Sequence, residues 1–257
     1  MDIISVEGIA PFLSNSKFSK NIYVFEILES TNNTAKEMAR DGAVHGTVVL
    51  ANAQTAGRGQ FGKAFFSPLG SGIYMSIILR PEAISGGCCK GSPDEPGSTI
   101  ECIDDCKKKS NTDPQALVTI LAAVRVCEAI EDLTGKSPKT KWVNDIYLNN
   151  KKICGILTES AVEHNSGSAD WTVIGIGINF DTPQEAFPEE LRPVAGSLFA
   201  ERSEVDGNRL IAEIMNLLLS PTELYDDEAL INKYLSRLGD SEEKEHIINE
   251  IKKHFNR

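Results

Sequence analysis

The first clear pattern is an alternation of apolar and polar residues at positions 21–30 (NIYVFEILES), which predicts a half-buried strand. The run STNN at residues 30–33 supplies hydroxyl and amide groups suited to capping a helix, and TAKEMAR at residues 34–40 predicts that helix. Further strands are predicted at residues 46–55, rich in Val and Leu, and at residues 72–81, β-branched and ended by a proline. The chain therefore begins as strand, turn and helix, followed by two strands around a glycine-rich loop.

The middle of the chain shows one long helical pattern and three strand patterns. Periodicity from Pro114 to Gly135 predicts a helix whose Ala-rich apolar face packs on a sheet. Residues 139–162 predict a hairpin that turns at the Asn-Asn pair 149–150. Residues 171–180 (WTVIGIGINF) are apolar on both faces and predict a central strand.

The last third is helical, with apolar faces at residues 208–220, 226–238 and 241–255. Residues 82–114 are poor in apolar side chains and predict a surface insertion. No repeat or linker composition divides the chain. We therefore expect one domain over residues 1–257, with the insertion at about 82–114 and a helical tail at about 241–257.

Composition and charge narrow the class of protein. The 257 residues are 41% hydrophobic and 25% charged, as in an ordinary globular protein. A net charge of -11 repels a phosphate backbone, so nucleic-acid binding is not expected. The start MDIISVEGIAPF lacks the features of a signal peptide, and the longest apolar stretch, residues 116–124, is too short for a membrane span. We expect a soluble, cytoplasmic protein.

In an intracellular chain of this size, the six cysteines are expected to remain free thiols and not to form disulfides. Four of them fall within residues 82–114, at spacings unlike those of common zinc motifs and with no histidine among them. A solvated loop with spare thiols is the favoured interpretation, and a metal site is the alternative. Cys127 and Cys154 lie in apolar patterns and are expected to be small core residues.

The loop at residues 54–63 (QTAGRGQFGK) has the spacing G-x-G-x-x-G of dinucleotide-binding loops. That site needs a helix directly after the loop, because the pyrophosphate binds at the helix N-terminus. Residues 63–72 (KAFFSPLGSG) carry a proline and two glycines and lead into a strand, which excludes a dinucleotide fold. The loop could instead close over an anion with Arg58 and Lys63, or be a hairpin loop with a solvated arginine.

Three later stretches favour an anionic ligand. KWVND at residues 141–145 brings a cation, an amide and a carboxylate near a strand end, where they could hold Mg²⁺ or a ribose. KKICGIL at residues 151–157 sets Lys152 beside an apolar strand. GIGIN at residues 175–179 has two glycines in a buried strand, where glycine is costly unless something lies against it. Together they indicate a phosphate-bearing ligand lying across a sheet.

In this order and at comparable spacing, STNNTA, QTAGRGQFGKAFFSP, KWVNDI, KICGILTE and GIGINF resemble the catalytic domain of biotin protein ligases over about residues 20–240. The resemblance implies an α+β fold, with a mixed, mostly antiparallel sheet flanked by helices, related to class II aminoacyl-tRNA synthetases. It also implies a two-step reaction: biotin and ATP, with Mg²⁺, give biotinyl-5′-AMP, and a lysine of a biotin carboxyl carrier protein takes the biotinyl group.

The resemblance also implies roles for individual residues. The catalytic residues would be Arg58, Lys152 and Asp145. The biotin contacts would be Ser30, Thr31, Asn32, Gln54, Gly57, Arg58 and Lys152. The ATP contacts would be Gln60, Lys63, Phe65, Asn144, Asp145 and Asn179, with Asn144 and Asp145 also holding Mg²⁺.

The chain departs from the family pattern at several places. Gln60 stands where an arginine is frequent, and Val143 stands where a proline is usual. No small C-terminal β-barrel is expected after residue 240, and no N-terminal helix-turn-helix, so no repressor role is expected. Two other functions stay open, a lipoate ligase of the same superfamily and a non-catalytic biotin or adenylate sensor. A homodimer is compatible with the sequence.

Overall fold

The computed structural model describes residues 3–80, 114–162, 169–201, 205–220 and 227–239, together with residues 245, 248 and 249. Its elements, in chain order, are α1 (Val6–Ile9), η1 (Ala10–Phe12), η2 (Ser16–Asn21), β1 (Ile22–Leu28), α2 (Thr31–Arg40), β2 (Thr47–Gln54), η3 (Gln60–Gly62), β3 (Gly72–Leu79), α4 (Pro114–Thr134), β4 (Lys139–Lys141), β5 (Asp145–Leu148), β6 (Lys151–Val162), β7 (Ala169–Asn179), η5 (Gln184–Ala186), α5 (Gly207–Leu218) and α6 (Asp227–Arg237). The expected insertion and helical tail lie outside the described residues, apart from Pro114 and those three single positions.

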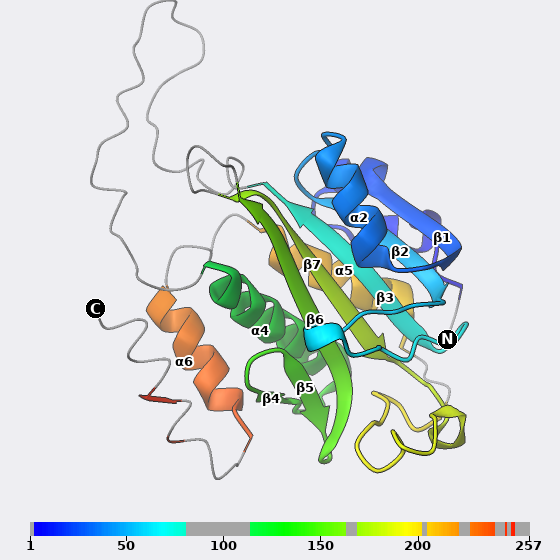
Figure 1. Cartoon of the computed structure of the whole chain (residues 1–257), viewed down its shortest axis with the longest axis vertical. Coiled ribbons are helices and arrows are strands. Elements are labelled where there is room, and N and C mark those ends of the chain that lie inside the picture. The colour runs from blue at the N-terminus through cyan, green and yellow to red at the C-terminus, as the bar shows by residue number, and fades with distance from the viewer. Residues whose placement is uncertain are drawn as a thin grey trace, which may run out of the picture.

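The seven strands form one sheet in the order β1-β2-β3-β7-β6-β5-β4 (Figure 1). β1 and β2 are parallel, and every other neighbouring pair is antiparallel. The expectation of a mixed, mostly antiparallel sheet is thus confirmed. β7 lies in the middle, between β3 and β6, as its apolar pattern on both faces predicts.

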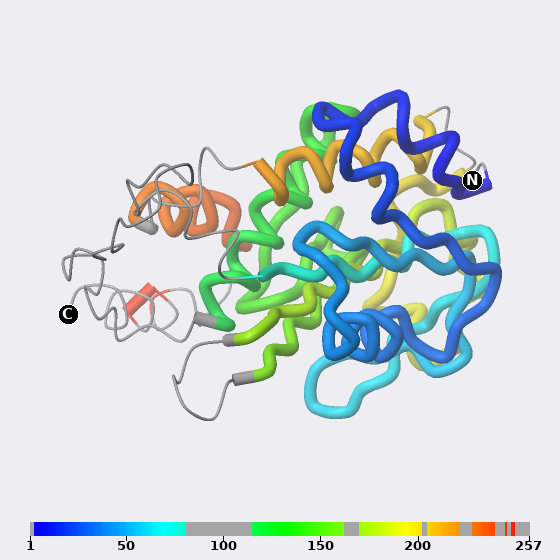
Figure 2. Tube along the Cα trace, turned by 90° about the horizontal axis from the view of Figure 1, so that it is seen from above, coloured from blue at the N-terminus to red at the C-terminus, as the bar shows by residue number. Residues whose placement is uncertain are grey.

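Helices cover the two faces of the sheet unequally. α4, α5 and α6 pack on one face over the main core, to which β7 contributes Ile174, Ile176 and Ile178. α2 packs on the other face with Ala35 and Ala39, over a small second core. Figure 2 shows α4 and α5 on one side of the strands and α2 on the other. Because α2 is only ten residues long, it leaves part of its face uncovered.

A side chain of β2 and one from the residue that follows β3 hold the two ends of α2. At its N-terminus, the Thr31 N–H donates to Gln54 Oε1 at 2.8 Å. At its C-terminus, Arg80 Nη2 donates to the carbonyls of Ala39 at 2.6 Å and Ala43 at 3.0 Å. Ser30 occupies the N-cap position, but its side chain makes no capping hydrogen bond. The predicted helix is confirmed, but it begins at Thr31, within the segment expected to cap it, and its first N–H is bonded from β2 because the Ser30 side chain faces a cavity.

The register of β3 and β7 explains why the uncovered part of the sheet is hollow. Tyr74 pairs with Gly177 and Ser76 with Gly175, and these residues point to the face that carries α2. Side chains alternate along a strand, so two glycines at successive positions of one face of β7 lower that face and leave the other packed. The glycines therefore open space on the α2 side of the central strand.

Both described cysteines are buried and free, as expected for core residues. Burial is the main cause that raises the pKa of the Cys127 thiol to about 12. Because the thiolate is the reactive form, Cys127 is inert at neutral pH. The four cysteines of the insertion lie outside the described ranges.

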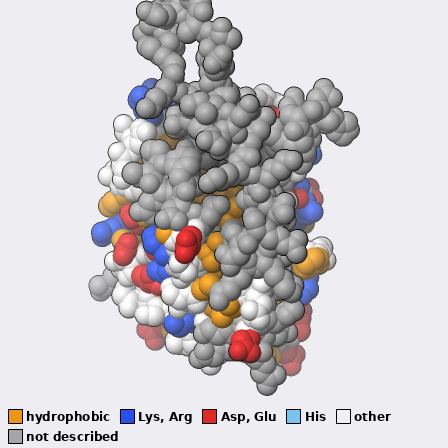
Figure 3. Space-filling view, turned by 90° about the vertical axis from the view of Figure 1, so that its left-hand side faces the viewer, with side chains coloured by type: hydrophobic (Ala, Val, Ile, Leu, Met, Phe, Trp, Pro, Cys, Tyr) orange, Lys and Arg blue, Asp and Glu red, His pale blue; other side chains and the backbone are white. Residues whose placement is uncertain are grey.

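Charges of both signs are interspersed on the described part of the face seen in Figure 3, next to a strip of apolar side chains. None of the helices in the described ranges combines the length and the apolar character needed to cross a bilayer.

Candidate active site

A cavity of about 350 Å³ lies on the α2 face of the sheet. Its walls come from the start of α2, the loop after β2, the turn before β5, and the facing strands β6 and β7. The structure brings most of the predicted site residues together here: Ser30, Thr31, Asn32, Gln54, Arg58, Gln60, Lys63, Phe65, Asn144, Asp145 and Lys152. Segments more than one hundred residues apart in the sequence thus share one site.

Two predicted residues, Gly57 and Asn179, do not line the cavity within the described ranges. A Cβ on Gly57 would come within 2.5 Å of the Phe65 carbonyl oxygen and 2.6 Å of Ser67 Oγ, so its close approach is to the chain itself. The buried Asn179 amide donates to the Gly196 carbonyl at 3.0 Å. Both residues therefore shape segments next to the site.

The glycines of β7 make room for side chains that come from elsewhere. A Cβ on Gly175 would lie 2.0 Å from Asn32 Oδ1, and one on Gly177 would lie 2.6 Å from the Phe65 ring. The groups that lie against these glycines are thus side chains of the protein itself, whereas the sequence pattern indicated a ligand. Asn32 and Phe65 therefore lie over β7 positions that are two residues apart. Asn32 is at one end of the cavity and Phe65 is at the other.

The end near α2 is lined by neutral polar groups. Gln54 Oε1 accepts from the Thr31 N–H at 2.8 Å and from Thr31 Oγ1 at 3.2 Å. Gln54 Nε2 donates to Ser67 Oγ at 2.9 Å, which fixes the amide orientation. Ser30 is only 1% exposed, and its side chain is free of helix capping. This end offers hydroxyl and amide groups to a neutral polar ligand.

Backbone hydrogen bonds join the two sides of the glycine loop. The Gly59 N–H donates to the Lys63 carbonyl at 2.7 Å, and the Phe65 N–H donates to the Gly57 carbonyl at 2.8 Å. The loop holds only the three-residue η3, with Phe61 at φ 56°, and then leads into β3. No α-helix follows it in this fully described stretch, so the exclusion of a dinucleotide fold is confirmed.

The tip of the loop carries one cation and one exposed aromatic ring. Arg58 Nη1 donates to Asn33 Oδ1 at 2.9 Å, and its side chain keeps 44% of its surface exposed. Phe61 is 95% exposed. Since an exposed guanidinium can change partners at little cost, Arg58 is available to an anion in the cavity.

A lysine and an aspartate meet across the β5–β6 hairpin. Lys152 Nζ lies 2.7 Å from Asp145 Oδ1. The backbone of Lys152 is fixed as well, because its N–H donates to the Val194 carbonyl at 2.8 Å and its carbonyl accepts from Gly196 at 3.0 Å. A well-held ammonium at a cavity wall can stabilise negative charge that develops in a reaction.

The donor set beside Lys152 fits a metal that arrives with a phosphate ligand. Asn144 and Asp145 both line the cavity, and Mg²⁺ in phosphate sites commonly uses one or two carboxylates together with phosphate oxygens and water. The described residues contain no group of three or more His, Cys, Asp or Glu that could hold a metal by themselves. Asn144 also donates through Nδ2 to the Ile156 carbonyl at 2.9 Å, which holds its turn against β6.

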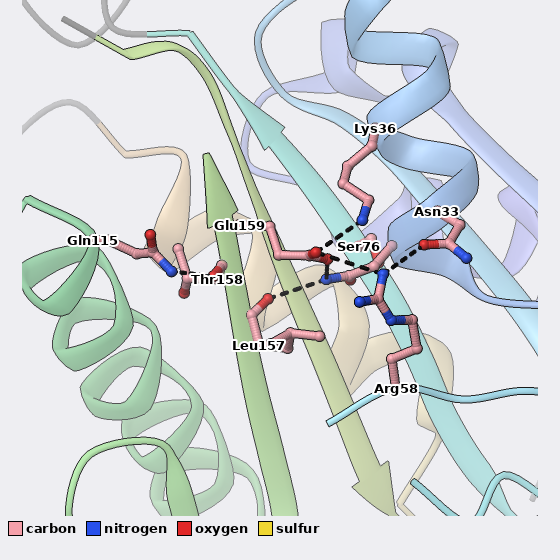
Figure 4. A network of polar contacts seen from close by, with 9 residues as sticks. Asn33, Lys36, Arg58, Ser76, Gln115, Leu157, Thr158 and Glu159 are labelled. Atoms are coloured by element: carbon pink, nitrogen blue, oxygen red, sulfur yellow. Dashed lines mark hydrogen bonds and ion pairs between the residues drawn. The ribbon is translucent and has the colours of Figure 1, made fainter. Parts of the chain in front are cut away.

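Glu159 is a charged residue next to the site that the motifs did not single out. It ends the stretch KICGILTE and accepts from Lys36 Nζ at 2.8 Å and from Asn32 Nδ2 at 3.0 Å, while Arg58 Nη1 lies at 3.5 Å (Figure 4). Burial disfavours its charged form, but hydrogen bonds from Lys36 and Asn32 and the nearby cations outweigh burial and lower its pKa. Glu159 therefore stays ionised.

The lowered pKa makes stability depend on pH. Glu159 stabilises the fold above its ordinary pKa of 4.5, and this contribution is lost as the pH falls through its lower folded value. Glu159→Gln should therefore lower the urea midpoint at pH 7, with a difference that shrinks in acid. Urea unfolding at several pH values measures this. Glu26→Gln, an exposed glutamate on β1, is the control, and an equal difference at every pH would contradict the prediction.

Comparison with known proteins agrees with this geometry. The chain matches the biotin/lipoate A/B protein ligase family over residues 24–87 and 99–179. It is 34% identical over 217 residues to the bifunctional ligase/repressor BirA of Bacillus subtilis (strain 168), covering 84% of this chain and 57% of that protein. It is 30% identical over 154 residues to biotin--[acetyl-CoA-carboxylase] ligase of Paracoccus denitrificans, covering 59% of this chain and 51% of that protein. The chain thus spans little more than half the length of these relatives.

A solved structure shares the fold. The biotin protein ligase from Aquifex aeolicus in complex with biotin and ATP aligns with a TM-score of 0.61 at 23% identity, over 85% of this chain and 78% of that chain. The expected class of fold, a sheet flanked by helices as in biotin ligases, is confirmed.

Proposed function

The chain belongs to the biotin/lipoate A/B protein ligase family, and from that membership we propose that it is an ATP-dependent biotin protein ligase. The observation that carries the proposal is one cavity lined by neutral polar groups at Thr31 and Gln54 and by two cations, Arg58 beside α2 and Lys152 on β6. Biotin has the matching halves, a neutral ureido ring and a carboxylate. A ligand of this kind can span the cavity with each half facing suitable groups.

In the first step, a biotin carboxylate oxygen attacks the α-phosphorus of ATP. The bond from that phosphorus to the bridging oxygen breaks, and pyrophosphate leaves with the electron pair. Arg58 pairs first with the carboxylate and then with the adenylate phosphate, while Lys152 stabilises the negative charge of the five-coordinate phosphorus. Asp145 holds the Lys152 ammonium in position through their 2.7 Å ion pair.

The remaining cavity residues bind the two substrates. Ser30, Thr31, Asn32 and Gln54 form the biotin end, where hydroxyls and amides can pair with a ureido group. Phe65 at the other end can stack on adenine, and Gln60 and Lys63 lie on the loop above it. Asn144 and Asp145 would hold Mg²⁺, which neutralises phosphate charge when it is bound with ATP. For Asn179 we propose an indirect contribution, through the Gly196 and Lys152 backbone that its amide contacts.

In the second step, the amine of a carrier-protein lysine attacks the acyl carbon and AMP leaves. A mixed anhydride hydrolyses readily, so the glycine loop also has to keep water away until the lysine arrives. The names of the relatives support a biotin carboxyl carrier domain of acetyl-CoA carboxylase or a similar carboxylase as the partner. The single sheet and its main core support a one-domain catalytic unit.

One experiment tests the proposal. The protein is incubated with biotin, Mg·ATP and an apo carrier domain, and the carrier mass and pyrophosphate release are followed. Carrier biotinylation supports the ligase. Pyrophosphate without carrier modification would favour the adenylate sensor, and modification only with lipoate would favour a lipoate ligase. In either case the proposal would be wrong.

The loop position occupied by Gln60 gives a quantitative prediction. Gln60 lines the cavity at the start of η3 and offers no charge to the adenylate phosphate. Gln60→Arg adds a charge-assisted contact and should slow release of biotinyl-5′-AMP about tenfold. Stopped-flow displacement of the intermediate measures the off-rate, with Gln60→Met as the uncharged control. An off-rate for Gln60→Arg equal to that of the wild type would refute the role given to this position.

A further inference from the structure

Arg58, the loop cation that pairs with the biotin carboxylate in the proposed reaction, is held by a side chain of α2. Its Nη1 donates to Asn33 Oδ1 at 2.9 Å (Figure 4). Arg58 lines the cavity, whereas Asn33, in the first turn of α2, is not among the described residues that do. Any effect of Asn33 on a ligand therefore has to pass through Arg58.

The main chain that leads to Arg58 is already fixed relative to α2. The N–H groups of Thr55 and Ala56 donate to the carbonyls of Leu28 and Glu29, both at 2.9 Å, in the turn before the helix. The long side chain of Arg58 is less restricted, because 44% of its surface is exposed. Ordering such a side chain costs conformational entropy, so a contact that orders it in advance matters for binding.

The contact with Asn33 leaves part of the guanidinium group for a ligand. A guanidinium carries its N–H groups in one plane and binds a carboxylate best through two parallel bonds from neighbouring nitrogens. Asn33 and, at 3.5 Å, the Glu159 carboxylate both lie against Nη1. The edge formed by Nε and Nη2 remains, and Figure 4 shows these two nitrogens turned away from Asn33. Arg58 can therefore receive a carboxylate through two bonds without leaving Asn33.

An amide suits this role because it holds the guanidinium without cancelling its charge. The Glu159 carboxylate lies closer to Lys36 Nζ, at 2.8 Å, and to Asn32 Nδ2, at 3.0 Å, than to Arg58 Nη1, at 3.5 Å. The close partner of Arg58 is thus the neutral Asn33. Because arginine only donates hydrogen bonds, Oδ1 and not Nδ2 of this amide has to face it.

We infer that Asn33 is a positioning residue that orders Arg58 for the carboxylate of the ligand before the ligand binds. The entropy cost of fixing the arginine is then met by the folded protein and is not subtracted from binding. This inference rests on the proposed function. It assigns part of the affinity for the carboxylate half of biotin to a side chain that does not line the cavity.

Biotin and biotinamide separate this role from a purely structural one, because biotinamide has the same ring system but carries no charge at its carboxyl carbon. Calorimetry measures the affinity of both ligands for the wild type, Asn33→Ala, Arg58→Ala and the double variant. Asn33→Ala should weaken biotin binding about three- to tenfold, the range expected for ordering one long side chain, and keep biotinamide affinity within about twofold. When Arg58 is already alanine, Asn33→Ala should have no further effect, because both changes interrupt the same contact.

Several results would overturn the inference: an equal loss for the two ligands, an additive double variant, or biotin affinity that is unchanged or increased in Asn33→Ala. Thr34→Ala is the matched control, since it changes the next position of α2 and leaves the contact between Asn33 and Arg58 in place. It should keep both affinities within about twofold. A loss as large as that of Asn33→Ala would indicate general damage to α2 and would contradict the inference.

Failure of the inference can be distinguished from failure of the proposed function. If the wild type does not bind biotin, or if Arg58→Ala weakens biotin no more than biotinamide, the proposed function or its pairing of Arg58 with the carboxylate is wrong. If Arg58→Ala selectively weakens biotin and Asn33→Ala does not, only the inference is wrong.

Discussion

Lys152→Ala should reduce the rate of biotinyl-5′-AMP formation by about 100- to 1,000-fold, the cost typical of removing one preorganised group that stabilises transition-state charge. The ammonium is held by Asp145 at 2.7 Å and by the fixed backbone of β6, so no mobile side chain can replace it without rearrangement. Because the charge grows as the phosphorus becomes five-coordinate, the loss should fall mainly on kcat. Biotin-dependent exchange of pyrophosphate into ATP measures this step without a carrier protein.

The neighbouring lysine is a closely matched control. The Lys151 side chain points away from the cavity, and its Nζ donates to the carbonyls of Arg192 and Pro193. Lys151→Ala removes the same charge one residue away and should leave the exchange rate within about threefold of the wild type. Full activity of Lys152→Ala, or equal losses in both variants, would refute the role assigned to Lys152. Melting temperatures of the two variants separate loss of chemistry from loss of fold.

The elements of the fold were predictable where the apolar pattern is strong. The two-faced apolar run of β7 predicted a central strand, and Pro114 and Gly135 bounded α4 as expected. The order of strands was less accessible, because β3 pairs with β7 across nearly one hundred residues and β1 lies parallel to β2. Such pairings depend on contacts far apart in the chain, which periodicity does not encode.

The site residues that lie within the short sequence motifs were predictable. Arg58, Asp145 and Lys152 were chosen from short stretches, and the fold brings them to one cavity. Glu159 was missed because a charged residue on a half-buried strand has the pattern of an ordinary solvated side chain. What marks it is contact with α2, more than one hundred residues away in sequence. Only the folded chain reveals that contact.

The strand glycines connect the fold and the chemistry. In a strand interior, alanine is normally at least as favourable as glycine, because glycine loses more chain entropy on folding. Glycine at 175 and at 177 is required because Asn32 and Phe65 occupy the space of a Cβ. The two positions face the same side of β7, one at the proposed biotin end and one at the proposed adenine end. A methyl group added at Gly175 should therefore affect biotin binding, and one added at Gly177 should affect ATP binding.

Gly175→Ala is expected to weaken biotin binding about 10- to 100-fold with little change in the KM for ATP, because its methyl group displaces Asn32. Gly177→Ala displaces the Phe65 ring and should raise the KM for ATP by a similar factor, with biotin affinity kept within about threefold. Calorimetry with biotin and pyrophosphate-exchange kinetics with ATP measure the two effects.

The opposite effects expected of the two glycine variants on biotin and ATP binding distinguish a loss of substrate contacts from general damage to the strand. Ile178→Val removes one methylene from the opposite, core-facing side of β7 and costs about 0.5–1.5 kcal/mol of stability. If sheet destabilisation alone caused the losses, Ile178→Val would lower both affinities together. If both glycine variants weakened both substrates equally, the division of the cavity into a biotin end and an adenine end would be wrong. Opposite selectivity in the two variants is expected, because Asn32 and Phe65 belong to separate segments that meet β7 at different positions.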